Sequence, residues 1–131
     1  MNVETRLPHA ASSIPKARHA VDGLEATVDQ ETVDTVRLLV SELVTNSVRH
    51  GCGDESGYIE LLLRRDPRRV RVEIADTGGG FVPRPRSEGQ DEGSGWGLHL
   101  LEVLSHRWGT EHRSGTRVWF EIDCAAAGAT A

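Results

Sequence analysis

The sequence contains only one lysine, Lys16, and its other 14 cationic residues are arginines. A Walker-type phosphate loop ends in Gly-Lys-Ser or Gly-Lys-Thr, and a protein-kinase-type fold places a strand lysine on the phosphates. Lys16 lies in Ile-Pro-Lys-Ala-Arg, with no glycine loop around it. The sequence therefore disfavours both of these architectures, and it equally disfavours an enzyme that uses a Schiff-base lysine.

Cysteines and long apolar runs are also scarce. Cys52 and Cys124 form no Cys-x-x-Cys pair, which favours a reduced cytosolic protein over a disulfide framework. No apolar run approaches the roughly 18 residues of a membrane span, and the first ten residues contain no signal-peptide core. We therefore expect a cytoplasmic protein that does not contact membranes.

Length and charge narrow the class further. The net charge of -5 disfavours direct nucleic-acid binding, because domains that bind nucleic acids are usually basic. A chain of 131 residues corresponds to one domain with a core of its own. We expect a lead-in over residues 1–14 that contains an edge strand over 2–7, one domain over 15–123 and a disordered tail over 124–131.

The hydrophobic pattern predicts alternating groups of helices and strands. Helices are expected over 15–28, 31–50 and 97–105, and strands over 58–65, 69–76, 107–113 and 116–123. After the strand expected over 69–76, residues 78–97 hold seven of the 14 glycines. This segment is expected to be a loop, and a loop of this length is usually functional. The order predicts an α+β, two-layer sandwich with about three helices on one face of a mixed, mostly antiparallel sheet.

Polar side chains border the apolar stripe of the long helix expected over 31–50. Glu42, Asn46 and His50 recur every four residues beside Leu39 and Leu43, so they form a slowly turning line on that helix. Buried polar groups are costly without partners, and a ligand with a metal ion would satisfy them. The alternative is that they are partly exposed and solvated.

Two strands carry a polar residue at one end of an apolar face. Because side chains alternate along a strand, Asp76 shares a face with Val72 and Ile74. A carboxylate there could accept a hydrogen bond from an exocyclic amine, although a turn-forming aspartate before Gly78 would look the same. Thr116 begins the apolar face of the last strand, where an ordinary strand threonine is the alternative.

Glycines precede the helix expected over 97–105, in the segment Gly93-Ser94-Gly95-Trp96-Gly97-Leu98. Free backbone N–H groups and the helix dipole make such a position favourable for an anion. The spacing is not that of a dinucleotide-binding fingerprint, and no strand leads directly into it. A flexible linker is the alternative.

In chain order, four segments resemble the motifs of the GHKL ATPases, the superfamily that includes gyrase and the histidine kinases. Residues 42–51 resemble its N box, 76–80 its D-x-G-x-G box, 93–98 its second glycine box and 114–116 its late Gly-Thr element. The resemblance spans roughly residues 15–122 and implies the Bergerat ATP-binding fold. The chain length and the N-box sequence, SELVTNSVRHG, resemble those of the anti-sigma-factor serine kinase branch.

The resemblance implies ATP and Mg²⁺ as cofactors and gives the polar residues their roles. It implies that Asn46 is the Mg²⁺ ligand and that Glu42 is the catalytic general base. It also implies that Asp76 accepts a hydrogen bond from the adenine amine, with support from Thr116. The other residues implied to lie at the nucleotide are Arg49, His50, Gly78, Gly80, Gly93, Gly95, Trp96, Gly97 and Leu98.

The function implied is a serine/threonine protein kinase of the anti-sigma-factor type. Such a kinase phosphorylates a small anti-anti-sigma partner of the STAS type and sequesters a sigma factor. A non-catalytic, nucleotide-dependent protein-binding module would use the same pocket and stays an alternative. We expect 131 residues to leave no room for the transducer segments of the larger ATPases, and whether the chain forms a homodimer stays open.

Overall fold

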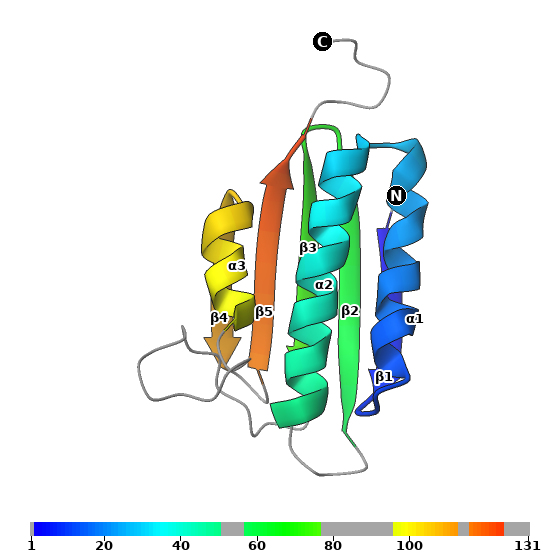
Figure 1. Cartoon of the computed structure of the whole chain (residues 1–131), viewed down its shortest axis with the longest axis vertical. Coiled ribbons are helices and arrows are strands. Elements are labelled where there is room, and N and C mark those ends of the chain that lie inside the picture. Colours follow the sequence, from blue (N-terminus) through cyan, green and yellow to red (C-terminus); the bar gives the residue numbers. More distant parts are fainter. Residues whose placement is uncertain (1, 51–56, 77–95, 113–115, 125–131) are drawn as a thin grey trace.

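Figure 1 shows a computed structural model of the chain, in which residues 2–50, 57–76, 96–112 and 116–124 are described. These residues form five strands, three α-helices and one 3₁₀ helix. In chain order the elements are β1 (Asn2–Pro8), α1 (Ser13–Ala20), the 3₁₀ helix η1 (Val21–Ala26), α2 (Gln30–His50), β2 (Tyr58–Asp66), β3 (Arg69–Asp76), α3 (Trp96–Leu104), β4 (Arg107–His112) and β5 (Thr116–Asp123).

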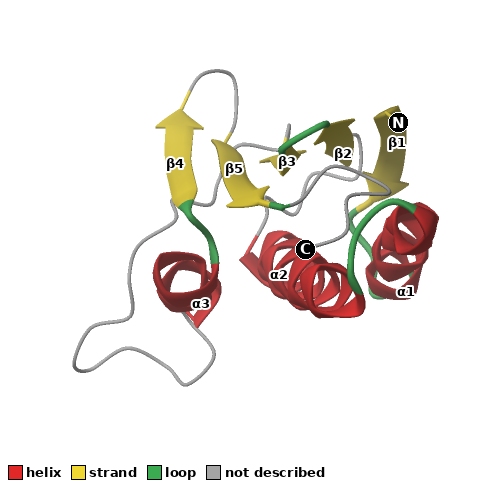
Figure 2. Cartoon of the chain, turned by 90° about the horizontal axis from the view of Figure 1, so that it is seen from above, coloured by secondary structure: helices red, strands yellow, loops and turns green. Residues whose placement is uncertain are grey.

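The five strands form one sheet in the order β1-β2-β3-β5-β4. All four strand pairings in the described part of the chain are antiparallel. The three α-helices lie together on one face of this sheet, and the described elements leave the other face uncovered (Figure 2). The predicted α+β, two-layer architecture is therefore confirmed.

The core lies between the sheet and the helices, because apolar residues at alternating positions of β2, β3 and β5 point toward the helix layer. In β2, for example, Ile59, Leu61 and Leu63 are buried, whereas the residues between them are partly exposed. The stripe predicted on α2 packs against this face, since all of its apolar members are buried: Val33, Val36, Leu39, Val40, Leu43 and Val44. None of the helices in the described ranges is long and apolar enough to cross a membrane.

The single helix expected over 15–28 is wrong in its extent. The structure instead has α1, which ends at Ala20, followed directly by the 3₁₀ helix η1. Gly23 disfavours a continued α-helix, at a cost of about 1 kcal/mol relative to alanine. A 3₁₀ helix has three residues per turn, so it brings Val21 and Leu24 to the same side, and both are fully buried.

Candidate functional site

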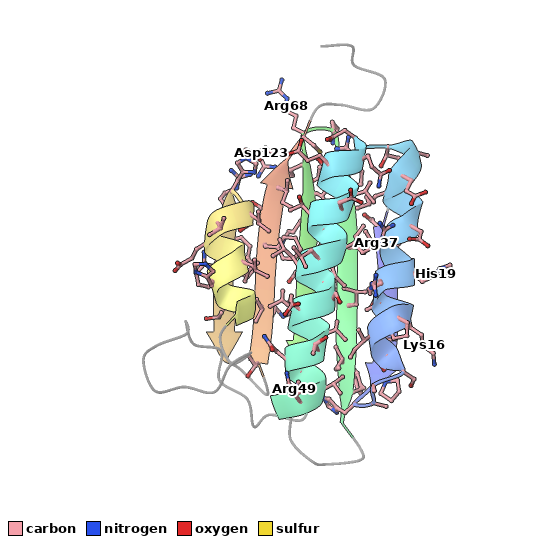
Figure 3. All side chains as sticks on the ribbon, in the orientation of Figure 1. Lys16, His19, Arg37, Arg49, Arg68 and Asp123 are labelled. Carbon is pink, nitrogen blue, oxygen red and sulfur yellow. The ribbon has the colours of Figure 1, made fainter. Side chains whose placement is uncertain are left out.

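The polar residues expected to form a site come from strands and a helix that end or begin at the same end of the molecule. At the lower end of the view in Figure 1, β3 finishes at Asp76, β5 starts at Thr116 and α2 finishes at its C-terminus. Arg49 is labelled on that last turn of α2 in Figure 3. Because α2 packs against β3, this end of the layer brings its polar residues toward the ends of the two strands.

Asp76 and Thr116 lie directly opposite each other in the antiparallel pairing of β3 with β5. Their exposed fractions are only 3% and 6%, and strand alternation turns both side chains toward the helices. A carboxylate in such a place is costly unless it is hydrogen-bonded. Asp76 is therefore an inward-facing acceptor at the end of an apolar strand face, as its position after Val72 and Ile74 predicted.

His9 is a further member of this cluster that the sequence did not indicate. Its Nε2 lies 2.9 Å from Oδ1 of Asp76, and its side chain is only 11% exposed. His9 lies just beyond the end of β1 at Pro8, where strand alternation no longer applies. Its contact with Asp76 depends on β1 pairing with β2 and β2 with β3, and no local pattern specifies those pairings.

The last turns of α2 carry the predicted metal ligand and general base. Asn46 is 5% exposed and Ser47 beside it is equally buried, so solvation does not explain the amide. Glu42 precedes Asn46 by one turn, on the same side of the helix, and it is half-buried. Arg49 is exposed. The solvated alternative therefore fits Glu42 only in part, and it does not fit Asn46.

Several of the residues predicted to contact the nucleotide lie outside the described residues. These are the four loop glycines Gly78, Gly80, Gly93 and Gly95. The backbones of Trp96, Gly97 and Leu98 form the first turn of α3, and that of His50 ends α2, but their side chains are not described. Their proposed contacts therefore stay predictions.

The side-chain oxygens at this end of the layer suit a magnesium ion that is coordinated mainly by phosphate oxygens. Mg²⁺ in nucleotide sites usually has one or two protein oxygen ligands, with phosphate oxygens and water completing the set. Among the described residues there is no group of three or more His, Cys, Asp or Glu that could hold a metal alone. The buried amide of Asn46 offers one such oxygen, and the buried carboxylate of Asp76 suits the amine of a base.

Comparisons with known proteins agree with this architecture. Residues 7–122 match the family described as the histidine kinase-like ATPase domain. The anti-sigma F factor of Clostridium acetobutylicum is 28% identical over 92 residues, which are 65% of this chain and 64% of that protein. The serine-protein kinase RsbW of Listeria monocytogenes is 29% identical over 118 residues, which are 78% of this chain and 74% of that protein.

A solved histidine kinase domain, from the blue-light activated histidine kinase EL346 of Erythrobacter litoralis, has the same fold. It superposes with a TM-score of 0.59 over 89% of this chain at 22% sequence identity. The chain spans less than two thirds of that structure, 61%, and 64% of the Clostridium acetobutylicum protein. The resemblance to the GHKL superfamily and its anti-sigma kinase branch is confirmed, and the chain belongs to the histidine kinase-like ATPase domain family.

Proposed function

We propose that this chain is an ATP-dependent serine/threonine protein kinase of the anti-sigma-factor type. It phosphorylates a small anti-anti-sigma protein of the STAS type and sequesters a sigma factor. The structural observation that supports the nucleotide site most directly is the buried pair of Asp76 and Thr116 at the end of an apolar strand face. The names of the anti-sigma F factor and the serine-protein kinase among its relatives support the kinase class.

In this proposal the described residues bind and orient the nucleotide from one end of the layer. Asp76 accepts a hydrogen bond from the adenine amine, and Thr116 supports it from the neighbouring strand. Asn46 offers its amide oxygen to Mg²⁺, which when bound neutralises charge on the phosphates. Arg49, exposed at the end of α2, supplies a fork of donors that suits phosphate oxygens.

Glu42 is the proposed general base. The hydroxyl oxygen of the acceptor serine forms a bond to the γ-phosphorus, the bond from that phosphorus to the bridging oxygen of ADP breaks, and the hydroxyl proton passes to the Glu42 carboxylate. Phosphoryl transfer depends mostly on positioning and charge stabilisation. The base is therefore one contributor among several, and nucleotide binding does not require it.

The proposed partners also indicate the subcellular location of the chain. ATP and sigma factors are both cytoplasmic, so the proposal places the kinase in the cytoplasm. Because the chain carries a net charge of -5, its effect on transcription passes through the protein partner rather than through contact with nucleic acid.

The decisive experiment separates binding from transfer. ATP affinity and transfer of γ-labelled phosphate to purified STAS-type proteins are measured for the wild type, Glu42→Gln and Asn46→Ala. We expect Glu42→Gln to bind ATP normally and to lose transfer by about 10²- to 10⁴-fold. Asn46→Ala should lose the Mg²⁺-dependent part of ATP binding. Glu31→Gln, an exposed change at the other end of the same helix, is the matched control.

Two results would count against this proposal. Transfer by Glu42→Gln at the wild-type rate would remove Glu42 from the role of general base. Nucleotide binding by the wild type, with no transfer to any STAS-type protein tested, would favour the non-catalytic binding module instead.

A further inference from the structure

One row of residues crosses four strands at the end of the sheet where the candidate site lies. Leu7 of β1 pairs with Ile59 of β2, Ile59 pairs with Asp76 of β3, and Asp76 pairs with Thr116 of β5. All four side chains are buried, with exposed fractions of at most 6%. His9 lies two residues after Leu7, just beyond the end of β1 at Pro8.

The turn that carries His9 is fixed by hydrogen bonds at a single carbonyl. The backbone oxygen of Pro8 accepts a bond of 2.6 Å from the Ser13 hydroxyl and one of 2.9 Å from the Ala10 N–H. Ser13 is fully buried. The backbone on both sides of His9 is thereby tied to the start of α1, so the imidazole projects from an ordered turn toward β3.

The contact between His9 and Asp76 has a defined chemical direction. An ionised carboxylate only accepts hydrogen bonds, so the histidine tautomer that fits this contact has its proton on Nε2, which donates a hydrogen bond to Oδ1 at 2.9 Å. Hydrogen bonds to a charged acceptor are stronger than neutral ones, and low exposure on both sides strengthens them further. A carboxylate has several acceptor positions, so this bond does not prevent Asp76 from accepting another.

We propose that His9 is a positioning residue for base recognition. Its Nε2–H holds the Asp76 carboxylate, whose terminal torsion is otherwise broad, in the orientation that accepts a bond from the exocyclic amine of the base. The inference rests on the proposed function, in which Asp76 accepts a bond from adenine. It adds that the preference of this chain for a 6-amino purine depends on a residue from the turn between β1 and α1.

A purely structural role would have a different consequence. If His9 only anchored its turn to β3, removing the imidazole would lower stability and would weaken all purine nucleotides alike. If it orients Asp76, its removal weakens a nucleotide with the exocyclic amine more than a nucleotide without it. The ratio of the two affinities therefore separates the two roles.

The test measures binding of ATP and of purine riboside 5′-triphosphate, which lacks the amine, by calorimetry. The wild type is compared with His9→Leu and His9→Gln, because the glutamine amide donates from a position similar to Nε2. We expect His9→Leu to reduce the preference for ATP by about fivefold and His9→Gln to restore most of it. His19→Leu, a change of an 86% exposed side chain on α1 (Figure 3), should leave the ratio unchanged.

The outcomes separate this inference from the proposal beneath it. A wild type that binds both nucleotides equally would overturn the base-recognition role of Asp76 and this inference with it. A wild type that prefers ATP, with the same preference in His9→Leu, would overturn the role of His9 alone. If His9→Leu does not fold, His9→Asn provides the same comparison. Its side chain is shorter, so its amide lies nearer the backbone and does not take the position of Nε2.

Discussion

The two faces of the sheet handle polar side chains in opposite ways, and β3 shows both. On its covered face Val70, Val72 and Ile74 are buried and apolar, and the only charged residue is Asp76 at the end. On its open face charged residues continue along the strand. On β3, the one charged group of the covered face therefore stands at the end where the candidate site lies.

Several charged residues of the open face pair with one another. Glu121 accepts hydrogen bonds from Arg107 at 2.7 Å and from Arg71 at 3.0 Å, and Glu73 accepts one from Arg117 at 3.0 Å. The guanidinium of Arg71 also lies over the ring of Trp119, 4.4 Å from its centroid. A buried carboxylate such as Glu121, 9% exposed, is therefore no sign of a ligand site when arginines from neighbouring strands surround it.

The largest expected effect is a difference in ATP affinity between variants of two carboxylates on opposite faces of β3. Asp76→Asn should lower ATP affinity by about 10- to 100-fold, because under the proposed function the adenine amine then loses a charged acceptor. Glu73→Gln, on the opposite face of the same strand, should change it by no more than about twofold. Calorimetric titration with ATP and Mg²⁺ measures both. Equal losses in the two variants would mean that the faces do not differ in function.

The second prediction concerns close packing on the open face. A Cβ atom at Gly109 would lie 2.7 Å from Nε1 of the Trp119 indole and 2.9 Å from two of its ring carbons. Arg71, on β3 at the other side of β5, also lies over that ring. We expect Gly109→Ala to lower the free energy of unfolding by about 1–3 kcal/mol, as measured by urea denaturation, and to leave ATP affinity unchanged.

A double-mutant cycle shows whether the indole causes that loss. In a Trp119→Leu background the alanine at position 109 has room, and the intrinsic preference of a strand for alanine over glycine should reappear. The cost of Gly109→Ala should then vanish or change sign. The same cost in both backgrounds would show that the close contact with the ring does not limit this position.

The sequence predicted best where an apolar period is long and regular. Residues 69–76 and 116–123 were expected as strands and are β3 and β5 with those bounds. The same periodicity placed Asn46 and Asp76 beside the core, and both are buried. For these residues the local pattern is sufficient, because burial of one face fixes where each side chain points.

Features that depend on strand pairing could not be predicted in this way. His9 and Asp76 are 67 positions apart, and only the order of β1, β2 and β3 brings them together. Alternation correctly places Glu121 on the open face, but its burial comes from arginines on other strands. The extent of the first helix was also missed: after Ala20 a 3₁₀ helix, which buries Val21 and Leu24, replaces the expected α-helix.

A smaller effect is expected for a carboxylate that serves only the fold of the helix layer. Asp29 precedes α2, and its two oxygens accept bonds from the N–H and the hydroxyl of Thr32, at 3.3 and 2.6 Å. Removing this N-cap by Asp29→Ala should lower the free energy of unfolding by about 1 kcal/mol. Asp29→Ser should restore most of the loss. ATP affinity below the unfolding transition should not change, in contrast to the result for Asp76→Asn.

The smallest effect concerns pH and the open face. Hydrogen bonds from Arg107, followed by those from Arg71, hold the pKa of Glu121 below its ordinary value of 4.5. A carboxyl whose pKa is lower in the folded state stabilises the fold at pH values above its unfolded pKa. This contribution is lost as the pH falls through the folded pKa, because protonation then removes the charge that the arginines contact.

Replacing Glu121 by glutamine tests that linkage. At pH 7, Glu121→Gln should lower the free energy of unfolding by less than about 1 kcal/mol, since its arginine partners are partly solvated. Between about pH 5 and pH 3 the wild type should lose this advantage, so the two unfolding curves should converge as acid is added. Urea denaturation across that range measures the difference. Curves that stay parallel would mean that the arginines stabilise the fold through packing, with Arg71 against Trp119, rather than through the charge of Glu121.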